Sequence, residues 1–518
     1  MHRRTFLSSG VSALAMARLP IPTSLAAQNE NATAARVRTL AHAISRRPFE
    51  RPAEVLPPAL GRIGYDEYRD IRFRSTKAVW HNEGLGFELQ FFATAYIYRS
   101  PVEIFLVENG AVRGFNADRS LFDFGPLEDE VPLGANLSFS GFRIHAPIKR
   151  SGYYDELMAF QGASYFRGLG RNHVYGLSAR ALALNTAGPD AEEFPFFRSF
   201  WIERPKDPRS ITVHALLDSP SVAGAFTFVI EPGQATVVDT DAVLYPRRDL
   251  TNVGIAPLTS MFLKAAHDSD GPRDFRPSVH DSDGLAVWNG RGERLWRPLL
   301  NPTALHVSCF RDNNPKGLGL VQRERRFEDY QDLEAQYERR PSAWVEPKTN
   351  LGSGCVELVE IPTAVEYNDN IVTSWRPDGR LLADRPYNFG YRLTWCDDTP
   401  AADWLRVHKT RTGTGSKPGL VQFTVDFVDS QADALRVEKL ASNNVIASDV
   451  PPVAQPDAAL TASAGTLSPP VVQSNPHLPG SRVSFELDPQ GAKESELRLS
   501  LSSGDRRTSE TWLYRWTA

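Results

Sequence analysis

Sulfur-containing residues are scarce in this sequence, and they show no metal-binding pattern. The 518 residues include only three cysteines and four methionines. Cys309, Cys355 and Cys396 lie too far apart for the paired spacing of a zinc or iron–sulfur motif. The sequence therefore gives no support to a metal centre built on thiolates.

Long apolar runs and basic clusters are also lacking. No apolar stretch reaches the roughly 20 residues that a membrane-spanning helix needs, although 41% of the residues are hydrophobic. The 58 Lys and Arg residues are outnumbered by 62 Asp and Glu residues, which gives a formal net charge of −4. We therefore expect no insertion into a membrane and no binding to nucleic acid.

The first 26 residues have the features of an export signal. Arg3 and Arg4 precede a mildly apolar stretch, and small residues follow up to Ala26. Twin arginines in this position are typical of the bacterial twin-arginine signal, and Pro20 and Pro22 disfavour a basic amphipathic helix. We expect cleavage after Ala26, which removes three arginines and changes the formal net charge from −4 to −7. The mature protein is then expected in the periplasm.

Export of this kind affects what the cysteines are expected to do. Exported proteins normally pair their cysteines, but twin-arginine substrates fold before export, in a reducing compartment. Cys309 and Cys355 lie in apolar, strand-like contexts, "ALHVSCF" and "GSGCVELVEI". We therefore predict that these two residues and Cys396 are free thiols in the core.

The residues that are abundant indicate a protein made mostly of β-strands. Apolar runs recur at intervals near ten residues up to about residue 395, and 38 Pro and 36 Gly residues supply many turns. The dipeptide Asn109-Gly110 predicts a tight hairpin. Helices are expected only over 32–49 and 327–341. The pattern predicts a large antiparallel β-sandwich over residues 27–396.

The remaining residues suggest a second, smaller unit. Residues 397–419 lack alternation and end in a Gly/Thr/Ser-rich stretch, which predicts a linker or mobile loop. Strict alternation follows, with Val421, Phe423, Val425 and Phe427 on one face of a strand. We predict an immunoglobulin-like sandwich over residues 420–518.

The motif "HDSDG" places His280, Asp281 and Asp283 close together. Three interpretations follow from the residues alone: a metal loop, a catalytic carboxylate or a solvated turn. The motif lacks the acidic spacing and the final glutamate of an EF-hand. No second histidine cluster accompanies it, so we expect no metal and no other cofactor.

A second acidic segment and a nearby aromatic segment suggest carbohydrate binding. The connection between the apolar runs "CVELVEI" and "NIVTSW" contains Glu366 and Asp369 and begins near Glu360. Aromatic rings stack on sugar C–H groups, and guanidinium and carboxylate groups bond to sugar hydroxyls. Such residues occur over 327–347, namely Tyr330, Tyr337, Arg339, Arg340, Trp344 and Glu346.

Four stretches together carry a resemblance to a known family. These are "DFRPSVHDSDGL", "DYQDLEAQYERRPSAWVEP", "VELVEIPTAVEYNDNIVTSW" and "SETWLYRW". They closely resemble the periplasmic glucans biosynthesis proteins G and D, over essentially the whole mature chain. A twin-arginine leader favours the D branch of that family, because the leader of the G branch is an ordinary secretory one.

The resemblance implies a fold and an activity. The fold is a mutarotase-like β-sandwich that carries a cleft, followed by an immunoglobulin-like domain. The family takes part in making osmoregulated periplasmic glucans, whose backbone is β-1,2-linked glucose. Some members hydrolyse β-1,2-glucan with inversion, and relatives transfer the chain instead and form a cyclic glucan.

The resemblance also implies residue roles. The catalytic aspartate of "HDSDG" matches Asp281, and the second catalytic aspartate matches Asp369 in "EYNDN". We expect Asp369 to be the general acid and Asp281 the general base, although the sequence leaves the opposite assignment open. The expected substrate-binding residues are Tyr337, His280, Asp283, Trp288, Arg339, Trp344 and Glu366. His280 and Asp283 are expected to orient Asp281 rather than to react, and residues 409–418 correspond to a region that can act as a lid.

Two classes of function remain open on the sequence. The first is an enzyme acting on β-1,2-glucan, as a hydrolase or as a cyclising transglycosylase. The second is a non-catalytic glucan-binding or scaffold protein that assists a membrane synthase. In either case we expect a β-1,2-linked glucan as the ligand, a homodimer, and a functional link to a membrane glucan synthase.

Overall fold

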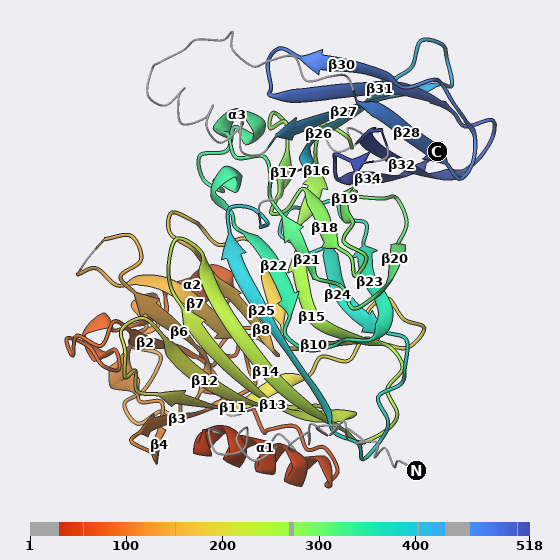
Figure 1. The fold of residues 1–518 in the computed structure, drawn as a ribbon. Helices are drawn as coiled ribbons and strands as arrows, with labels where there is room; N and C mark the ends of the chain where they lie inside the picture. Colours follow the sequence, from red (N-terminus) through yellow and green to blue (C-terminus); the bar gives the residue numbers. More distant parts are fainter. Residues whose placement is uncertain are drawn as a thin grey trace, which may run out of the picture.

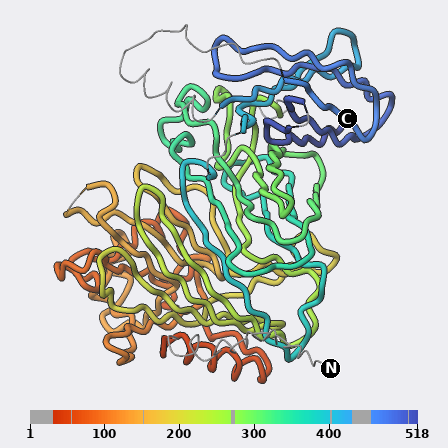
Figure 2. The backbone as a smooth tube through the Cα atoms, in the orientation of Figure 1, coloured from red at the N-terminus to blue at the C-terminus, as the bar shows by residue number. Residues whose placement is uncertain are grey.

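The protein is built mainly of β-strands, as the computed structural model in Figures 1 and 2 shows. The structure describes residues 31–54, 56–150, 152–268, 274–400, 404–429, 456–504 and 506–518. The predicted leader, residues 1–26, therefore lies outside the described residues. Among the described helices, none is long and apolar enough to cross a membrane.

In the part of the chain that the structure describes, the helices are few and most are short. The α-helices are α1 (Ala32–Ser45), α2 (Tyr65–Asp70) and α3 (Phe327–Tyr330). Single 3-10 turns are η2 (Ser75–Lys77), η3 (Arg119–Leu121), η4 (Gly125–Leu127) and η5 (Tyr337–Arg339).

Within the described ranges, three sheets contain most of the strands. A ten-stranded sheet contains β2 (Glu88–Ala93), β6 (Phe139–Ala146), β7 (Asp155–Gln161), β8 (Tyr165–Gly168), β9 (Ser178–Arg180), β10 (Leu182–Leu184), β15 (Val253–Ser260), β24 (Ile371–Pro377), β23 (Ser353–Glu360) and β20 (His306–Asn313). A fifteen-stranded sheet contains β4 (Ala111–Phe115), β3 (Glu103–Glu108), β11 (Phe196–Glu203), β12 (Ile211–Asp218), β13 (Val222–Glu231), β14 (Thr236–Pro246), β25 (Tyr387–Cys396), β22 (Ser342–Pro347), β21 (Gly317–Val321), β18 (Gly284–Trp288), β19 (Arg294–Pro298), β34 (Thr511–Thr517), β32 (Glu494–Ser503), β33 (Arg506–Arg507) and β28 (Asp457–Ala462). A five-stranded sheet contains β26 (Leu405–Thr414), β27 (Val421–Asp429), β31 (Gly480–Asp488), β29 (Thr466–Leu467) and β30 (Val471–Asn475). Two strand pairs complete the set, β1 (Arg72–Phe73) with β5 (Phe122–Asp123), and β16 (Phe262–Lys264) with β17 (Val279–His280).

The larger sandwich is held by aromatic packing between the ten-stranded and fifteen-stranded sheets. Phe142 and Phe160 of the first sheet lie with ring centroids 5.0 and 5.7 Å from Phe200 of the second. Phe228 joins the same cluster, 5.5 Å from Phe160. All four rings are almost completely buried. The predicted mostly-β fold with a large antiparallel sandwich is confirmed.

Helix α1 covers the outer face of this sandwich, at the bottom of Figure 1. The Asn31 side chain caps it by accepting a hydrogen bond from the Thr33 amide at 2.8 Å. Val37 and Ala41 are buried against strands β12, β13 and β14. The spacing of four between these apolar residues produced the prediction, and the helix is confirmed.

The predicted hairpin at Asn109-Gly110 is also confirmed. These two residues join β3 to β4 with positive φ values of 50° and 83°. Two left-handed residues in succession match the twist of the flanking strands, and Asn and Gly adopt that conformation at the lowest cost.

The C-terminal strands form a second sandwich, at the top of Figure 1. The ring of Phe423 in β27 stacks on that of Phe485 in β31, and both lie 6.0 Å from the indole of Trp512 in β34. Strand β34 also pairs in parallel with β19, with Leu295 opposite Thr511. The two sandwiches therefore share one continuous sheet.

Two local predictions about secondary structure are wrong. Residues 405–414, expected in a linker or lid loop, form strand β26, which pairs along its length with β27. The helix expected over 327–341 is reduced to α3 and η5. Left-handed Gln331 ends α3 and left-handed Gln336 directly precedes η5, and the Asp332 carboxylate accepts hydrogen bonds from the backbone amides of Glu334 and Ala335 between them.

The prediction of three free, buried cysteines is wrong for two of them. Cys309 and Cys355 form a disulfide between neighbouring strands β20 and β23, with their Cα atoms 5.6 Å apart. Strand β20 lies at the edge of its sheet, and Cys309 is exposed there. Cys396 is free and only partly exposed, and burial raises the pKa of its thiol to about 12.

Candidate active site

A cleft of about 740 Å³ opens on the larger sandwich. It is lined from well-separated parts of the chain, and most of its lining is polar or aromatic. The polar and aromatic residues lining it are Tyr65, Arg167, Tyr175, Asp281, Arg340, Thr363, Glu366, Tyr367, Asn368, Asp369 and Asn370. The two aspartates predicted to be catalytic therefore face one cleft.

Asp281 is placed by the short strand pair β16–β17. Its amide donates to the Met261 carbonyl at 2.8 Å, directly beside the pairing of Phe262 with His280. The next residue, Ser282, is held by a 2.9 Å hydrogen bond from the Ser260 hydroxyl. Asp281 is only 4% exposed, so backbone and side-chain contacts fix its position at the base of the cleft.

Asp369 lies in the connection between β23 and β24, and its neighbour Asn370 anchors that connection. The Asn370 amide group accepts from the Phe262 amide at 2.8 Å and donates to the Phe262 carbonyl at 2.9 Å. Because Phe262 pairs with His280, one asparagine ties the segment of Asp369 to the strand that leads to Asp281. Asn370 therefore links the two backbone segments that carry the aspartates.

Burial raises the pKa of the Asp281 carboxyl to about 6. The guanidinium of Arg340, in direct contact with that carboxyl, opposes the shift, and the negative charge of Asp369 adds to it. The two carboxylates therefore interact electrostatically. Asp281 is a carboxylate at neutral pH but is basic enough to accept a proton.

Burial is also the main cause that raises the pKa of the Asp369 carboxyl. Its carboxyl loses solvent within the cleft, although the residue as a whole lies on an exposed loop. The positive charges of Arg167, Arg180 and Arg340 act in the opposite direction. A carboxyl whose pKa is raised holds a proton to higher pH, as a general acid requires.

Arg340 lies between Asp281 and Tyr337. Its guanidinium carbon lies 4.2 Å from the centroid of the Tyr337 ring, in a cation–π contact. Gly176 leaves space for it, because a Cβ there would lie 2.9 Å from the Arg340 Cβ. The arginine is therefore held beside the aspartate by a ring on one side and a glycine on the other.

Glu366 is held by a small polar cluster at the mouth of the cleft. Its carboxylate accepts the Tyr337 hydroxyl at 3.2 Å and pairs with Arg276 at 2.7 Å. Arg276 also pairs with Asp274 and Asp332. The Tyr337 ring is only 2% exposed, so Tyr337 lies behind Arg340 and Glu366 rather than in the lining.

His280 and Asp283 do not line the cleft, so the prediction that they bind substrate is wrong. Both are buried, His280 completely. The His280 ring stacks on Phe262 and bonds through Nδ1 to the Gln322 side chain at 2.9 Å, and burial lowers its pKa to about 3. The Asp283 carboxylate accepts the amides of Arg323 and Glu324 at 3.1 and 3.2 Å. Their contacts agree with the other expectation, that they orient Asp281.

The pH dependence of stability offers a test of how Asp283 is buried. Burial, and then the nearby charge of Glu324, raise the Asp283 pKa to about 7, whereas an unfolded Asp titrates at about 3.9. Between those pH values the unfolded chain loses this proton and the folded chain keeps it, so Asp283 lowers the free energy of unfolding as pH rises. Asp283→Asn cannot titrate. The Tm of the variant minus that of the wild type should therefore increase from pH 5 to pH 8.

A suitable control for this experiment is Asp457→Asn, at an exposed site on β28. This variant measures the effect on Tm of an Asp-to-Asn change at an exposed position, at each pH. The proposed burial of an ionisable carboxyl would be contradicted if the Tm of Asp283→Asn minus that of the wild type stayed constant or decreased as pH rises.

Three other predicted binding residues lie outside the lining. Trp344 is 2% exposed and packs over Gly317 and Gly319 in the core, so its prediction is wrong. Trp288 lies at the end of β18 with the Arg294 guanidinium 4.4 Å from its ring. Arg339 is exposed and donates to the Asn172 carbonyl and to Gln336.

Several lining residues were not predicted. Arg167, Tyr65 and Tyr175 belong to segments more than a hundred residues before Asp281, and no local motif marks them. Tyr367 is adjacent to a predicted residue and is 83% exposed, as an aromatic binding platform requires. Among the described residues, no group of three or more His, Cys, Asp or Glu side chains could hold a metal ion.

Comparisons with known proteins identify relatives along almost the whole chain. A family profile described as "Periplasmic glucan biosynthesis protein, MdoG" matches residues 33–516. A protein named "Glucans biosynthesis protein G" from Shewanella sp. (strain W3-18-1) is 46% identical over 483 residues, which cover 92% of this chain and 86% of the relative. The protein of the same name from Vibrio cholerae serotype O1 is 46% identical over 484 residues, covering 92% and 85%.

Solved structures were also compared with this chain. A galactose mutarotase related enzyme from Lactobacillus acidophilus is 11% identical, covers 52% of this chain and 94% of its own, and has a TM-score of 0.21. That likeness is too low to support any argument about function. The relatives above carry the name of protein G, so the assignment to the D branch stays a prediction.

Proposed function

The chain belongs to the periplasmic glucan biosynthesis family MdoG, and from this premise we propose that it is an inverting enzyme acting on β-1,2-linked glucan. Membership of the family supports a role in periplasmic glucan biosynthesis. The linkage, the chemistry and the catalytic residues are parts of the proposal. Export by the twin-arginine route, a homodimer and a functional link to a membrane synthase also stay predictions.

One observation above all supports catalysis rather than binding alone. Asp281 and Asp369 come from segments about ninety residues apart, yet both carboxylates face the same cleft. Burial raises the pKa of both. Binding a neutral sugar does not require two acids of raised pKa in one cleft, whereas inverting hydrolysis requires one acid and one base on opposite faces of the sugar ring.

The lining also suits an extended sugar chain. Tyr65 and Tyr367 are 61% and 83% exposed and line the cleft, so their rings are free to stack on pyranose faces. Arg167 and the side chain of Asn368 offer hydrogen bonds to hydroxyl groups. The carboxylate of Glu366, fixed by Arg276 and Tyr337, offers an acceptor in a defined position.

The proposed mechanism assigns one step to each aspartate. Asp369 protonates the leaving glycosidic oxygen, and Asp281 accepts a proton from the attacking group, directly or through an intervening hydroxyl or water. The Asp281 pKa of about 6 leaves it ionised at neutral pH and suits this role. Water as the attacking group gives hydrolysis, and a sugar hydroxyl gives transglycosylation or a cyclic product.

The proposal is tested by incubating the purified protein with linear β-1,2-glucan and following chain length by chromatography. Shorter or cyclic products are expected. Saturable binding with unchanged chain length would instead support the rival function, a non-catalytic glucan-binding protein that assists a synthase.

A further inference from the structure

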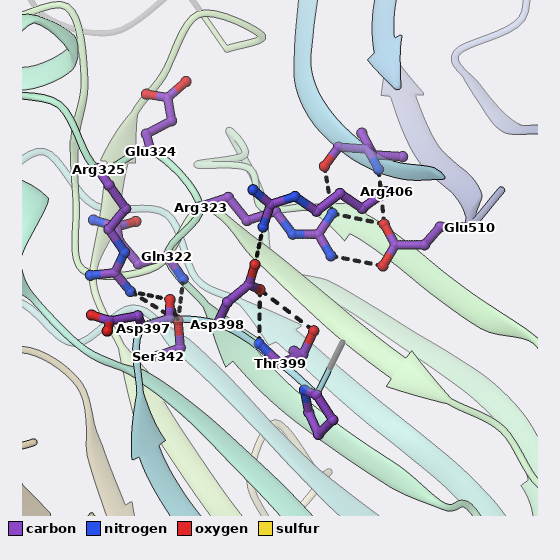
Figure 3. A network of polar contacts seen from close by, with 12 residues as sticks. Gln322, Arg323, Glu324, Arg325, Ser342, Asp397, Asp398, Thr399, Arg406 and Glu510 are labelled. Carbon is purple, nitrogen blue, oxygen red and sulfur yellow. Dashed lines mark hydrogen bonds and ion pairs between the residues drawn. The ribbon is translucent and has the colours of Figure 1, made fainter. Parts of the chain in front are cut away.

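A four-residue segment, Gln322–Arg325, lies between the cleft and the C-terminal sandwich. It directly follows strand β21, and Figure 3 shows some of its polar contacts, among them the pair of Arg323 with Glu510. Gln322, Arg323 and Glu324 are almost completely buried. Buried polar groups of this kind hold their positions only when all of their partners are in place.

On one side, the segment holds the residues that flank Asp281. The Gln322 side-chain amide donates to the His280 carbonyl at 3.0 Å and to the Tyr337 carbonyl at 3.1 Å. The Gln322 side-chain oxygen lies 2.9 Å from His280 Nδ1. Gln322 therefore fixes both the backbone and the ring of the residue that directly precedes Asp281.

The next two residues act on the other flank of Asp281. The backbone amides of Arg323 and Glu324 both donate to the same carboxylate oxygen of Asp283, at 3.1 and 3.2 Å. The Asp283 amide in turn donates to the Val321 carbonyl at 3.0 Å. The chain from His280 to Asp283 is thus clamped at both ends by one segment.

On its opposite side, the segment binds the C-terminal sandwich. The Arg323 guanidinium donates to both carboxylate oxygens of Glu510 at 2.8 Å and to the Val407 carbonyl at 2.5 Å. The Glu510 carboxylate also accepts the Val407 amide at 2.9 Å. The guanidinium carbon lies 3.6 Å from the centroid of the Trp296 ring.

A second ion pair reinforces this attachment. Lys409 in β26 lies 2.6 Å from the Glu324 carboxylate and 3.1 Å from that of Asp329. Strand β26 is the element that was expected to be a lid loop. The structure instead places it as a fixed support for the segment behind the cleft.

We propose that Glu510 is a positioning residue, which sets the location of Asp281 from the C-terminal sandwich through Arg323 and the segment that clamps residues 280–283. The inference rests on the proposed function, because it assumes that Asp281 transfers a proton. It assigns to the C-terminal sandwich a part in catalysis that acts through residues 322–325 and not through contact between Glu510 and substrate.

The test compares Glu510→Gln with a matched variant, Glu293→Gln. Glu293 also joins the two sandwiches, through Arg498, Arg507 and Thr511, but it lies in the β18–β19 turn and has no contact with residues 322–325. Both changes replace a carboxylate by an amide of similar size. Glu510→Gln removes the ion pair with Arg323, and Glu293→Gln removes the two ion pairs with Arg498 and Arg507.

Glu510→Gln is expected to lower kcat by about 10-fold to 100-fold with little change in KM, because a small misplacement of a reacting group is costly and substrate contacts remain. Glu293→Gln should leave kcat unchanged. Hydrogen exchange measured by mass spectrometry gives a readout that does not need activity. Amides of residues 278–284 should exchange faster in Glu510→Gln than in the wild type, and at the wild-type rate in Glu293→Gln.

Equal effects of the two variants on exchange at 278–284, or no effect of either, would overturn the inference. An inactive wild type would overturn the proposed function alone, because the exchange comparison still decides whether the coupling exists. If Glu510→Gln does not fold, Arg323→Lys takes its place in the test. This variant keeps the positive charge but loses the paired hydrogen bonds that the guanidinium donates to the two Glu510 oxygens. It should show the same faster exchange at 278–284, and an unchanged rate there would count against the coupling.

Discussion

Asp281→Asn is expected to lower kcat for β-1,2-glucan by about 10²–10⁴-fold, the usual contribution of one general acid or base. The amide keeps the shape of the side chain but cannot accept a proton at neutral pH. Asp369→Asn should cause a loss of the same order, because the amide cannot protonate a leaving oxygen. Both variants should still bind glucan, since the aromatic lining is unchanged.

The control for this pair is Asp283→Asn, which changes an acid two residues away that does not line the cleft. Its loss of kcat should be much smaller. The Tm of each variant must be measured with the rates, so that lost chemistry is separated from lost structure. Near-normal turnover in both Asp281→Asn and Asp369→Asn, with the fold intact, would remove the basis for an active site here.

Arg340→Met is expected to move the acidic limb of the kcat/KM profile to higher pH by about one unit or more. Arg340 contacts the Asp281 carboxyl and lowers its pKa, against the larger effect of burial. Without the guanidinium, the pKa of Asp281 rises above about 6 and the base is protonated at a higher pH. Activity should therefore decrease more at pH 6 than at pH 8.

Arg339→Met provides the matched control, because it removes the neighbouring guanidinium. Arg339 is exposed and bonds to Asn172 and Gln336 outside the lining. Its pH profile should coincide with that of the wild type. An acidic limb that stays in place in Arg340→Met, or that moves to lower pH, would show that Asp281 is not the group that titrates.

The parts of the fold that follow from local pattern could be predicted. Alternation of apolar residues identified β27 and β31, a spacing of four identified α1, and Asn109-Gly110 identified a hairpin. These signals act within a few residues, where side-chain periodicity determines which face is buried. The two aspartates that line the cleft could be singled out in the sequence because each lies in a long, specific motif.

Features that depend on contacts far apart in sequence could not be predicted. The parallel pairing of β19 with β34, which joins the two sandwiches, links residues more than two hundred positions apart. The disulfide depends on the register of β20 and β23, which brings Cys309 near Cys355. Arg167 and Asn370 resemble many other polar residues, and only the folded chain shows what they contact.

The same limit explains why Trp344 was misassigned. An aromatic residue beside arginines resembles a sugar platform in the sequence, but β22 directs this ring into a space left by two glycines. His280 and Asp283 are adjacent in sequence to the cleft residue Asp281 and its neighbour Ser282, but their own side chains are buried outside the lining. Their partners, Gln322 and the amides of Arg323 and Glu324, lie about forty residues away.

The most direct test of the central claim is a proton NMR time course of the protein with linear β-1,2-glucan. The measurement follows the configuration of each newly formed anomeric centre, with Asp281→Asn as the blank. An inverting enzyme converts a β-linkage to an α-configured centre, whether the acceptor is water or a sugar hydroxyl. We predict new α signals with the wild type and none with the variant. The β signals of a free reducing end also arise later by mutarotation, so inversion would be contradicted by β signals that appear before the α signals. An unchanged spectrum would contradict catalysis at this cleft.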